Sequence, residues 1–168
     1  HALELGYATP EHSISMTPNV PKPRSRGTIR LAGPDPDLAP VYDPAYLTDP
    51  DGYDEAMLLH GVELARRIAD TDPMRAWIAR ETFPGPVGAD ELRDLVRRSH
   101  HTVYHVSGTA RMGADGDPLA VCDPALRVRG LDGLRVADAS AFPSVTSINP
   151  MVTIFMLAER AADLIRAS

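Results

Sequence analysis

The chain has little cysteine, no excess of basic charge and no long apolar run. Its single cysteine, Cys122, excludes an internal disulfide and any metal site built from several cysteines. A net charge of −6 gives no basic surface for nucleic acid. The longest apolar stretch, Met151–Ala158, is far shorter than the roughly 20 residues that a membrane-spanning helix needs. We therefore expect a cytoplasmic or otherwise soluble protein, with neither a nucleic-acid partner nor a membrane span.

The composition that remains is that of a globular protein with many loops. The 168 residues are 43% hydrophobic and 24% charged, and they include 16 prolines and 12 glycines. That share of proline and glycine exceeds the usual value of about 12%, which predicts ordered loops between short elements. The chain starts at His1 rather than Met, and no targeting signal is visible in its first residues. We expect a piece of a longer protein, with a trimmed terminus as the alternative.

Hydrophobic periodicity predicts a few elements, and residues 35–50, rich in Pro and Asp, leave little room for regular structure. We expect helices over residues 53–70, 74–80 and 151–166, a helix capped by Asp90 with the stripe Leu92, Leu95 and Val96, and strands over 27–31, 134–137 and from Val121. Pro150 suits the first turn of the last helix.

His105 is the first candidate for chemistry. It lies between Tyr104 and the small residues Ser107 and Gly108, which permit close approach of another group. Histidine is the usual side chain for proton transfer near neutral pH. The alternative is an ordinary hydrogen-bonded histidine without a catalytic role.

Asn149 and Pro150 precede the last predicted helix and form the second candidate. Asn is a favoured N-cap and Pro a favoured next residue, so capping alone explains the pair. A helix N-terminus also attracts negative charge, and the Asn149 amide can donate to a substrate oxygen. Both interpretations remain open here.

Two further patterns are weaker. The predicted strand 134–137 ends in Asp138 and Ala139, and ligands often bind beyond the carboxyl ends of strands, although a simple polar turn is commoner. His101 and His105 have the i, i+4 spacing of a metal pair on a helix, but Val103 and Tyr104 favour a strand. No serine lies in a Gly-x-Ser-x-Gly elbow, which argues against a serine hydrolase.

The order of these patterns is more specific than any one of them. The chain carries Tyr104-His105-x-x-Gly108-Thr109-x-Arg111-Met112-Gly113, then Val121-Cys122-Asp123-Pro124, Gly133-Leu134-Arg135-Val136-Ala137-Asp138-Ala139-Ser140, Asn149-Pro150 and Ala158-Glu159-Arg160-Ala161-Ala162. This run resembles the C-terminal signature of the glucose–methanol–choline (GMC) flavin oxidoreductases, and the Asn-Pro pair resembles the choline-oxidase branch. Residues 24–31 and 43–47 resemble the family's substrate-domain strand and the loop that follows it.

The resemblance implies a role for each matching residue. His105 matches the family's catalytic base, and Asn149 matches a second active-site position, which is His or Asn across the family and would donate to the developing oxyanion. Tyr104, His105 and Asn149 would contact a small alcohol substrate. Asp138, Ala139, Asn149, Pro150 and Met151 match the segments that contact FAD. The implied reaction oxidises a primary or secondary alcohol to a carbonyl by hydride transfer to the flavin.

The resemblance also implies a fold and partners. It implies an α+β or α/β architecture, with a substrate domain of antiparallel sheet and covering helices mainly over residues 1–120. Residues 121–168 would supply the last strand and helix of a Rossmann-like FAD-binding domain.

This chain has no Gly-x-Gly-x-x-Gly fingerprint, so another chain or a cleaved segment would supply the N-terminal FAD-binding half. Oxygen or another acceptor would take the electrons, and no metal would take part. The alternatives are a non-catalytic binding subunit of the same fold and a metal hydrolase that uses His101 and His105.

Overall fold

The computed structural model describes residues 5–8 and 10–167, so the start of the chain at His1 lies outside the described residues. The chain divides into two compact units. The first contains the chain up to Gly27 together with Pro44–His101, and the second contains Thr28–Asp43 together with the chain from Thr102. Each unit is described by itself. The predicted domain boundary near residue 120 stays a prediction.

The first unit is built from the helices α1 (Tyr53–Ala69), α2 (Asp72–Arg75) and α3 (Ala89–Ser99). Helix α1 confirms the predicted helix over 53–70. Helix α2 is shorter and earlier than the predicted helix over 74–80, because Pro73 fits the first turn of a helix but not its interior. Gly88, not Asp90, is the N-cap of α3, and Asp90 lies in its first turn, where a negative charge is favourable.

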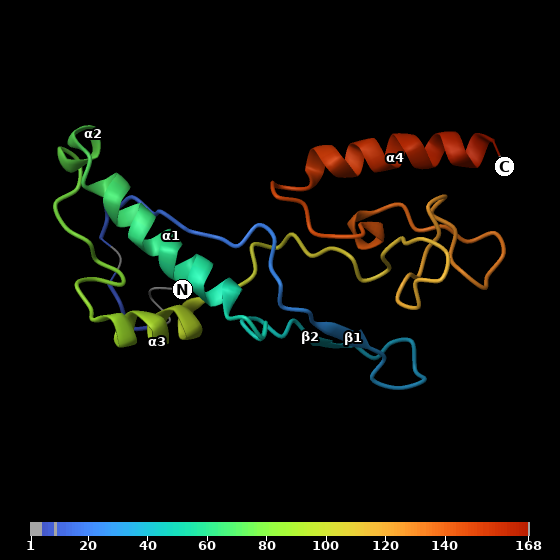
Figure 1. Cartoon of the computed structure of the whole chain (residues 1–168), viewed down its shortest axis with the longest axis horizontal. Coiled ribbons are helices and arrows are strands. Elements are labelled where there is room, and N and C mark those ends of the chain that lie inside the picture. Colours follow the sequence, from blue (N-terminus) through green and yellow to red (C-terminus); the bar gives the residue numbers. More distant parts are fainter. Residues whose placement is uncertain (1–4, 9, 168) are drawn as a thin grey trace. The chain divides into compact units, whose positions relative to one another are not determined.

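Helices α1 and α3 lie side by side in Figure 1. The predicted stripe of α3 is confirmed, since Leu92, Leu95 and Val96 are all buried. At the edge of this contact Glu55 of α1 pairs with both Arg93 and Arg97 of α3. The helix pair is therefore held by an apolar stripe with an ion-pair cluster beside it.

Helix α1 begins where it does because Asp49 caps it from outside. Gly52 has a φ of 63° and supplies no side-chain cap. The Asp49 carboxylate instead accepts hydrogen bonds from the backbone N–H groups of Tyr53 (2.6 Å) and Asp54 (3.2 Å). These are first-turn donors that have no acceptor within a helix.

Asp54 links this helix start to the segment that contains Arg24 and Ser25. Its side chain is only 3% exposed and accepts from the backbone N–H groups of Arg24 (2.8 Å) and Ser25 (2.9 Å). Burial by itself raises the pKa of Asp54. The hydrogen bonds from the Ser25 hydroxyl and the two amides outweigh it and hold the pKa of Asp54 below its ordinary value.

Replacing Asp54 with alanine is expected to lower the free energy of unfolding by about 1–3 kcal/mol, because two partly buried backbone donors lose their acceptor. The matched control is Asp51→Ala, which removes an exposed ion pair with Arg24 and is expected to cost less than about 1 kcal/mol. Urea unfolding near pH 7 measures both, and equal losses in the two variants would contradict the role given to Asp54.

The contribution of Asp54 also depends on pH. Because its pKa is lower in the folded than in the unfolded state, the stabilisation is complete above about pH 4 and is lost as the pH falls through the folded-state pKa. The difference between wild type and Asp54→Ala should therefore shrink in strongly acidic buffer.

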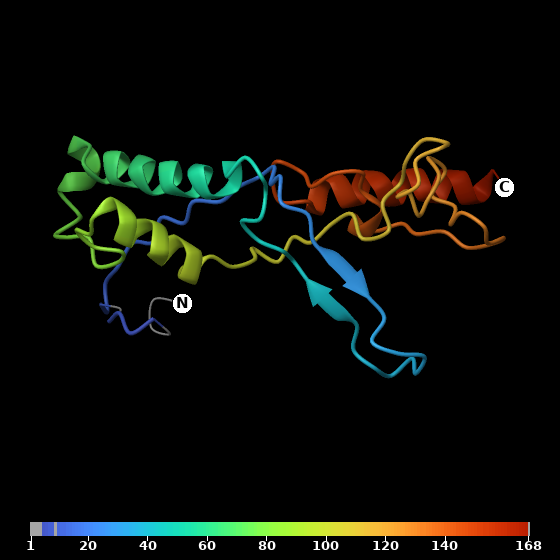
Figure 2. The same ribbon diagram turned by 60° about the horizontal axis from the view of Figure 1, so that its bottom comes forward.

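The second unit begins with a hairpin of two antiparallel strands, β1 (Thr28–Arg30) and β2 (Val41–Asp43), visible in Figure 2. Strand β1 confirms the predicted strand over 27–31. Strand β2 is the short regular element that residues 35–50, expected to leave little room for regular structure, contain. The register pairs Ile29 with Tyr42, and this cross-strand contact between an apolar and an aromatic residue stabilises a strand that local composition disfavours.

The rest of the second unit is loops, one short 3₁₀ turn η1 (Ala139–Ala141) and the helix α4 (Met151–Arg166), which confirms the predicted helix with its bounds. The predicted strands over 134–137 and from Val121 are wrong. Arg135 and Cys122 make only isolated bridges, with Arg127 and with Met112 and Val128, because no strand of the described residues lies beside them.

The core of the second unit lies under α4. Leu157 and Ala161 of the helix form a buried cluster with Leu126, Ala141 and Phe142. The η1 turn and the loop around Leu126 are thereby fixed against the helix. Among the residues that the structure describes, none of the helices has both the length and the apolarity needed to cross a bilayer.

Candidate functional site

The segment that carries the candidate base, residues 102–107, contains no helix or strand. Tyr104 has a φ of 64°, and its backbone N–H donates to the Thr102 hydroxyl oxygen at 2.9 Å. His105 follows and is half-buried, and the Ser107 hydroxyl donates to its carbonyl oxygen at 3.4 Å. A turn closed by a side-chain hydroxyl therefore comes immediately before His105.

Three hydrogen bonds fasten the chain after His105 to the η1 turn. Backbone N–H groups of alternate residues donate to successive carbonyl oxygens: Gly108 to Ala139 (3.1 Å), Ala110 to Ser140 (2.9 Å) and Met112 to Ala141 (2.9 Å). Gly108 has a φ of 82°, which disfavours any residue with a side chain, and a Cβ there would lie 3.4 Å from the Phe142 carbonyl oxygen. The two segments singled out in the sequence thus lie side by side.

Asp138 begins the η1 turn and caps it. Its carboxylate accepts the backbone N–H of Ser140 at 2.7 Å, and the residue is exposed. Ala139 packs at the edge of the core. The turn has only small side chains, and Asp138 is its exposed residue whereas Ala141 is fully buried.

The start of α4 differs from the expected cap. Pro150, not Asn149, is the N-cap, and its carbonyl oxygen accepts the N–H of Ile154 at 2.8 Å. The helical hydrogen bonding begins at the Pro150 carbonyl oxygen, so Asn149 precedes the first residue that takes part in it. Asn149 is exposed while Pro150 is buried, and no side-chain hydrogen bond caps the helix.

Helix α4 therefore has an open N-terminus. No side chain caps its first turn, whose N–H groups have no acceptor within the helix. Met151, the first helical residue, is 62% exposed. Such an end favours negative charge by on the order of 1 kcal/mol per contact.

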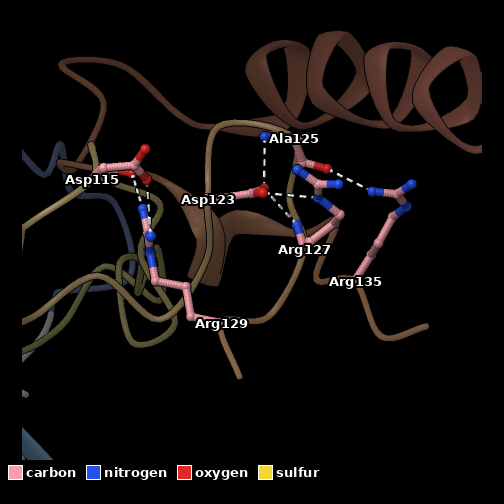
Figure 3. Close-up of polar contacts among 7 residues, drawn as sticks. Asp115, Asp123, Ala125, Arg127, Arg129 and Arg135 are labelled. Carbon is pink, nitrogen blue, oxygen red and sulfur yellow. Dashed lines mark hydrogen bonds and ion pairs between the residues drawn. The ribbon is translucent and has the colours of Figure 1, made fainter. Parts of the chain in front are cut away.

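Figure 3 shows how the loop between the two segments is held. Arg129 pairs with Asp115, and Arg135 donates to the Ala125 carbonyl oxygen at 2.9 Å. The Asp123 carboxylate accepts the Ala125 N–H at 2.8 Å and the Arg127 Nε at 2.8 Å. Burial by itself raises the pKa of Asp123, but the hydrogen bonds from Arg127 and Ala125 outweigh it and keep the pKa below its ordinary value.

This loop supports the site rather than forming it. The Asp123 turn gives Leu126 a φ of 65° and leaves it 1% exposed in the core beneath α4. Next to it, Cys122 is fully buried, and burial raises the pKa of its thiol, as expected for a structural cysteine.

The predicted site residues are thus only partly brought together. The hydrogen bonds join the segment after His105 to Asp138 and Ala139, and the core joins η1 to α4. The side chains of His105 and Asn149 take no part in these contacts. Tyr104 is 80% exposed.

His101 and His105 do not form an i, i+4 metal pair on a helix, because residues 100–105 are not helical. Within residues 5–8 and 10–167, no group of three His, Cys, Asp or Glu side chains is arranged to hold a metal ion.

The sequence did not identify Thr102 as a residue of the candidate site. A Thr two residues before a Tyr is compatible with a turn closed by its hydroxyl, but Ser and Thr make such turns only weakly, so composition alone does not identify it.

Residues 23–158 match the family model described as GMC oxidoreductase. The chain is 47% identical over 170 residues to choline oxidase from Arthrobacter globiformis, a match that covers 100% of this chain and 31% of that protein. The chain therefore spans less than a third of the length of the curated relatives that it matches.

Two solved structures share the fold. Pyridoxine 4-oxidase from Mesorbium loti is 37% identical with a TM-score of 0.80, over 88% of this chain and 28% of that one. An FAD-dependent oxidoreductase from Chaetomium thermophilum is 33% identical with a TM-score of 0.76, over 87% of this chain and 25% of that one.

Proposed function

The chain belongs to the GMC oxidoreductase family, and on that premise we propose that it is the C-terminal part of an FAD-dependent enzyme that oxidises a primary or secondary alcohol to a carbonyl. One observation carries this proposal. The hydrogen-bond ladder from Gly108 to Met112 fixes the segment that follows His105 against the Asp138–Ala141 turn. The segment that carries the candidate base and the Asp138–Ala141 turn thus belong to one unit.

The residues present fit a flavin. Asp138 and Ala139 lie in a turn of small side chains, and α4, which follows Asn149 and Pro150, offers the first-turn N–H groups from Met151 onward to an electron-rich ring edge. We expect these five residues to contact FAD. When bound, the flavin accepts a hydride from the alcohol carbon.

Within this chain, His105 acts as the base. Hydride leaves an alkoxide far more readily than an alcohol, so a base must remove the hydroxyl proton, and a neutral imidazole does so near pH 7. The Asn149 amide donates a hydrogen bond to the developing oxyanion without competing for the proton. Tyr104 lies next to His105 and borders the substrate.

The substrate we propose is a small alcohol. The relatives above are named for choline and pyridoxine, each of which carries a primary alcohol. Oxygen or another acceptor then takes the electrons.

We further propose that the FAD-binding half lies in another segment or chain. Two features of the second unit support this. The exposed part of α4 carries Met151, Val152, Phe155 and Met156, each more than 60% exposed. The β1–β2 hairpin exposes apolar residues too, and an isolated two-stranded hairpin is at best marginally stable. Apolar surfaces of this kind are expected to be covered by a partner.

The test compares FAD binding with and without that half. The chain alone is expected to retain no stoichiometric flavin, because it has no dinucleotide fingerprint, whereas the chain combined with its FAD-binding portion is expected to retain one FAD. Quenching of flavin fluorescence during titration measures both. A chain that purifies alone with stoichiometric flavin would show that no such partner is needed.

A further inference from the structure

The turn before His105 has an unusual backbone. Tyr104 has a φ of 64°, in the left-handed region that residues with a side chain rarely adopt. Its side chain is 80% exposed, so burial does not hold the backbone there. Such conformations persist only where the surroundings hold them, and they concentrate at functional sites.

A hydrogen bond from the Tyr104 N–H to the Thr102 hydroxyl oxygen, at 2.9 Å, closes this turn. The bond joins residues i and i+2 and closes a small ring around Val103, which is the geometry by which Thr stabilises turns. After His105, the corresponding contact from Ser107 is longer, at 3.4 Å, and is made to the carbonyl oxygen of His105 rather than to an amide.

We propose that Thr102 is a positioning residue for His105. Its hydroxyl holds Tyr104 in the left-handed conformation, and that conformation sets the direction in which the chain presents the His105 imidazole. This inference rests on the proposed role of His105 as the base. The ladder that begins at Gly108 fixes the chain on the C-terminal side of His105. The Thr102 hydroxyl fixes it on the N-terminal side.

Replacing Thr102 with valine removes the acceptor at nearly constant shape. In the complete flavoprotein we expect kcat for alcohol oxidation to fall about tenfold with little change in KM, because a misplaced base slows proton removal without weakening substrate binding. Thr102→Ser keeps the hydroxyl and is the matched control, expected within about twofold of wild type. A valine variant that matches wild type would overturn the inference.

A second comparison separates positioning from general damage. Glycine adopts a positive φ without strain, so in a Tyr104→Gly background the turn no longer needs the Thr102 hydroxyl. The Thr102→Val substitution should then cost less than about threefold relative to Tyr104→Gly alone. An equal tenfold loss in both backgrounds would show that Thr102 does not act through the Tyr104 turn.

A readout other than turnover comes from NMR of the histidine ring carbons. Thr102→Val is expected to shift or broaden the His105 signals and leave those of His12 and His60 unchanged, and Thr102→Ser should change none of them. Unperturbed His105 signals in the valine variant would overturn the inference.

Turnover of His105→Ala distinguishes failure of the base role of His105 from failure of the positioning role of Thr102. If that variant keeps its activity, the proposed role of His105 as the base fails, while the NMR comparison still decides whether Thr102 sets the surroundings of the His105 ring. If it loses activity while Thr102→Val is silent by both readouts, the positioning inference alone fails.

Discussion

Replacing His105 with alanine is expected to lower kcat for alcohol oxidation about a thousandfold, because a positioned general base contributes on the order of 10²–10⁴ in rate. Binding of the substrate should change much less than kcat, since the proton is removed on the way to the transition state. Steady-state kinetics of the complete flavoprotein measure both quantities. Imidazole added to the His105→Ala variant should restore part of the rate by entering the space left by the side chain.

His101→Ala is the matched control for this variant. It removes a neighbouring histidine that has no place in the proposed chemistry, and its kcat should stay within about twofold of wild type. If both histidine variants lost activity and a chelator did the same to wild type, the metal hydrolase alternative would gain support. If His105→Ala kept its turnover, the non-catalytic binding subunit would be favoured instead.

The Asn149→Ala variant is expected to lose about 10²–10³ in kcat, because removing one donor to an oxyanion typically costs that much. Asn149 is exposed and lies outside the helical hydrogen bonding of α4, so the loss should come without unfolding. Thermal unfolding, measured alongside the kinetics, should give a midpoint within a few degrees of wild type.

Asn149→His tests the chemical reason for that loss. The imidazole also donates a hydrogen bond, so this variant should recover a large part of the rate that alanine loses. A histidine variant as slow as the alanine variant would show that the amide does more than donate to the oxyanion. A large fall in the unfolding midpoint of Asn149→Ala would instead assign the residue a structural role.

The two long helices could be predicted from the sequence because their signals are local. Helix α4 has a sustained apolar face and a proline at its start, and α1 has an apolar periodicity that ends before Asp70. The family resemblance was equally local, since it depends on the order of short motifs between Tyr104 and Ala162. The family was confirmed by the match over residues 23–158.

The parts that could not be predicted depend on contacts between distant residues or on backbone geometry without a sequence signal. Strand β2 exists because Tyr42 pairs with Ile29, thirteen residues away. The cap of α1 is local, but it depends on a left-handed Gly52 that lets Asp49 reach the first turn, and this backbone geometry has no clear sequence signal. The expected strand over 134–137 failed for the opposite reason, because a strand needs neighbours that the described residues do not provide.

The candidate site, too, could be predicted only where its residues carry a local sequence signal. His105 and Asn149 were found as residue types in a recognisable order, and their catalytic roles stay predictions. The left-handed Tyr104 was not foreseen, because Tyr carries no signal for that conformation. Nor did any motif reveal that the Thr102 hydroxyl closes the turn.

The most direct test of the central claim is the absorbance spectrum of the complete protein, recorded without oxygen before and after addition of small alcohols. The account predicts a bound flavin band that bleaches on addition of a primary alcohol in wild type, and that bleaches about a thousandfold more slowly in His105→Ala. A complete protein without a flavin band, or with a band that no alcohol bleaches, would contradict the claim that this chain is part of a flavin-dependent alcohol oxidoreductase.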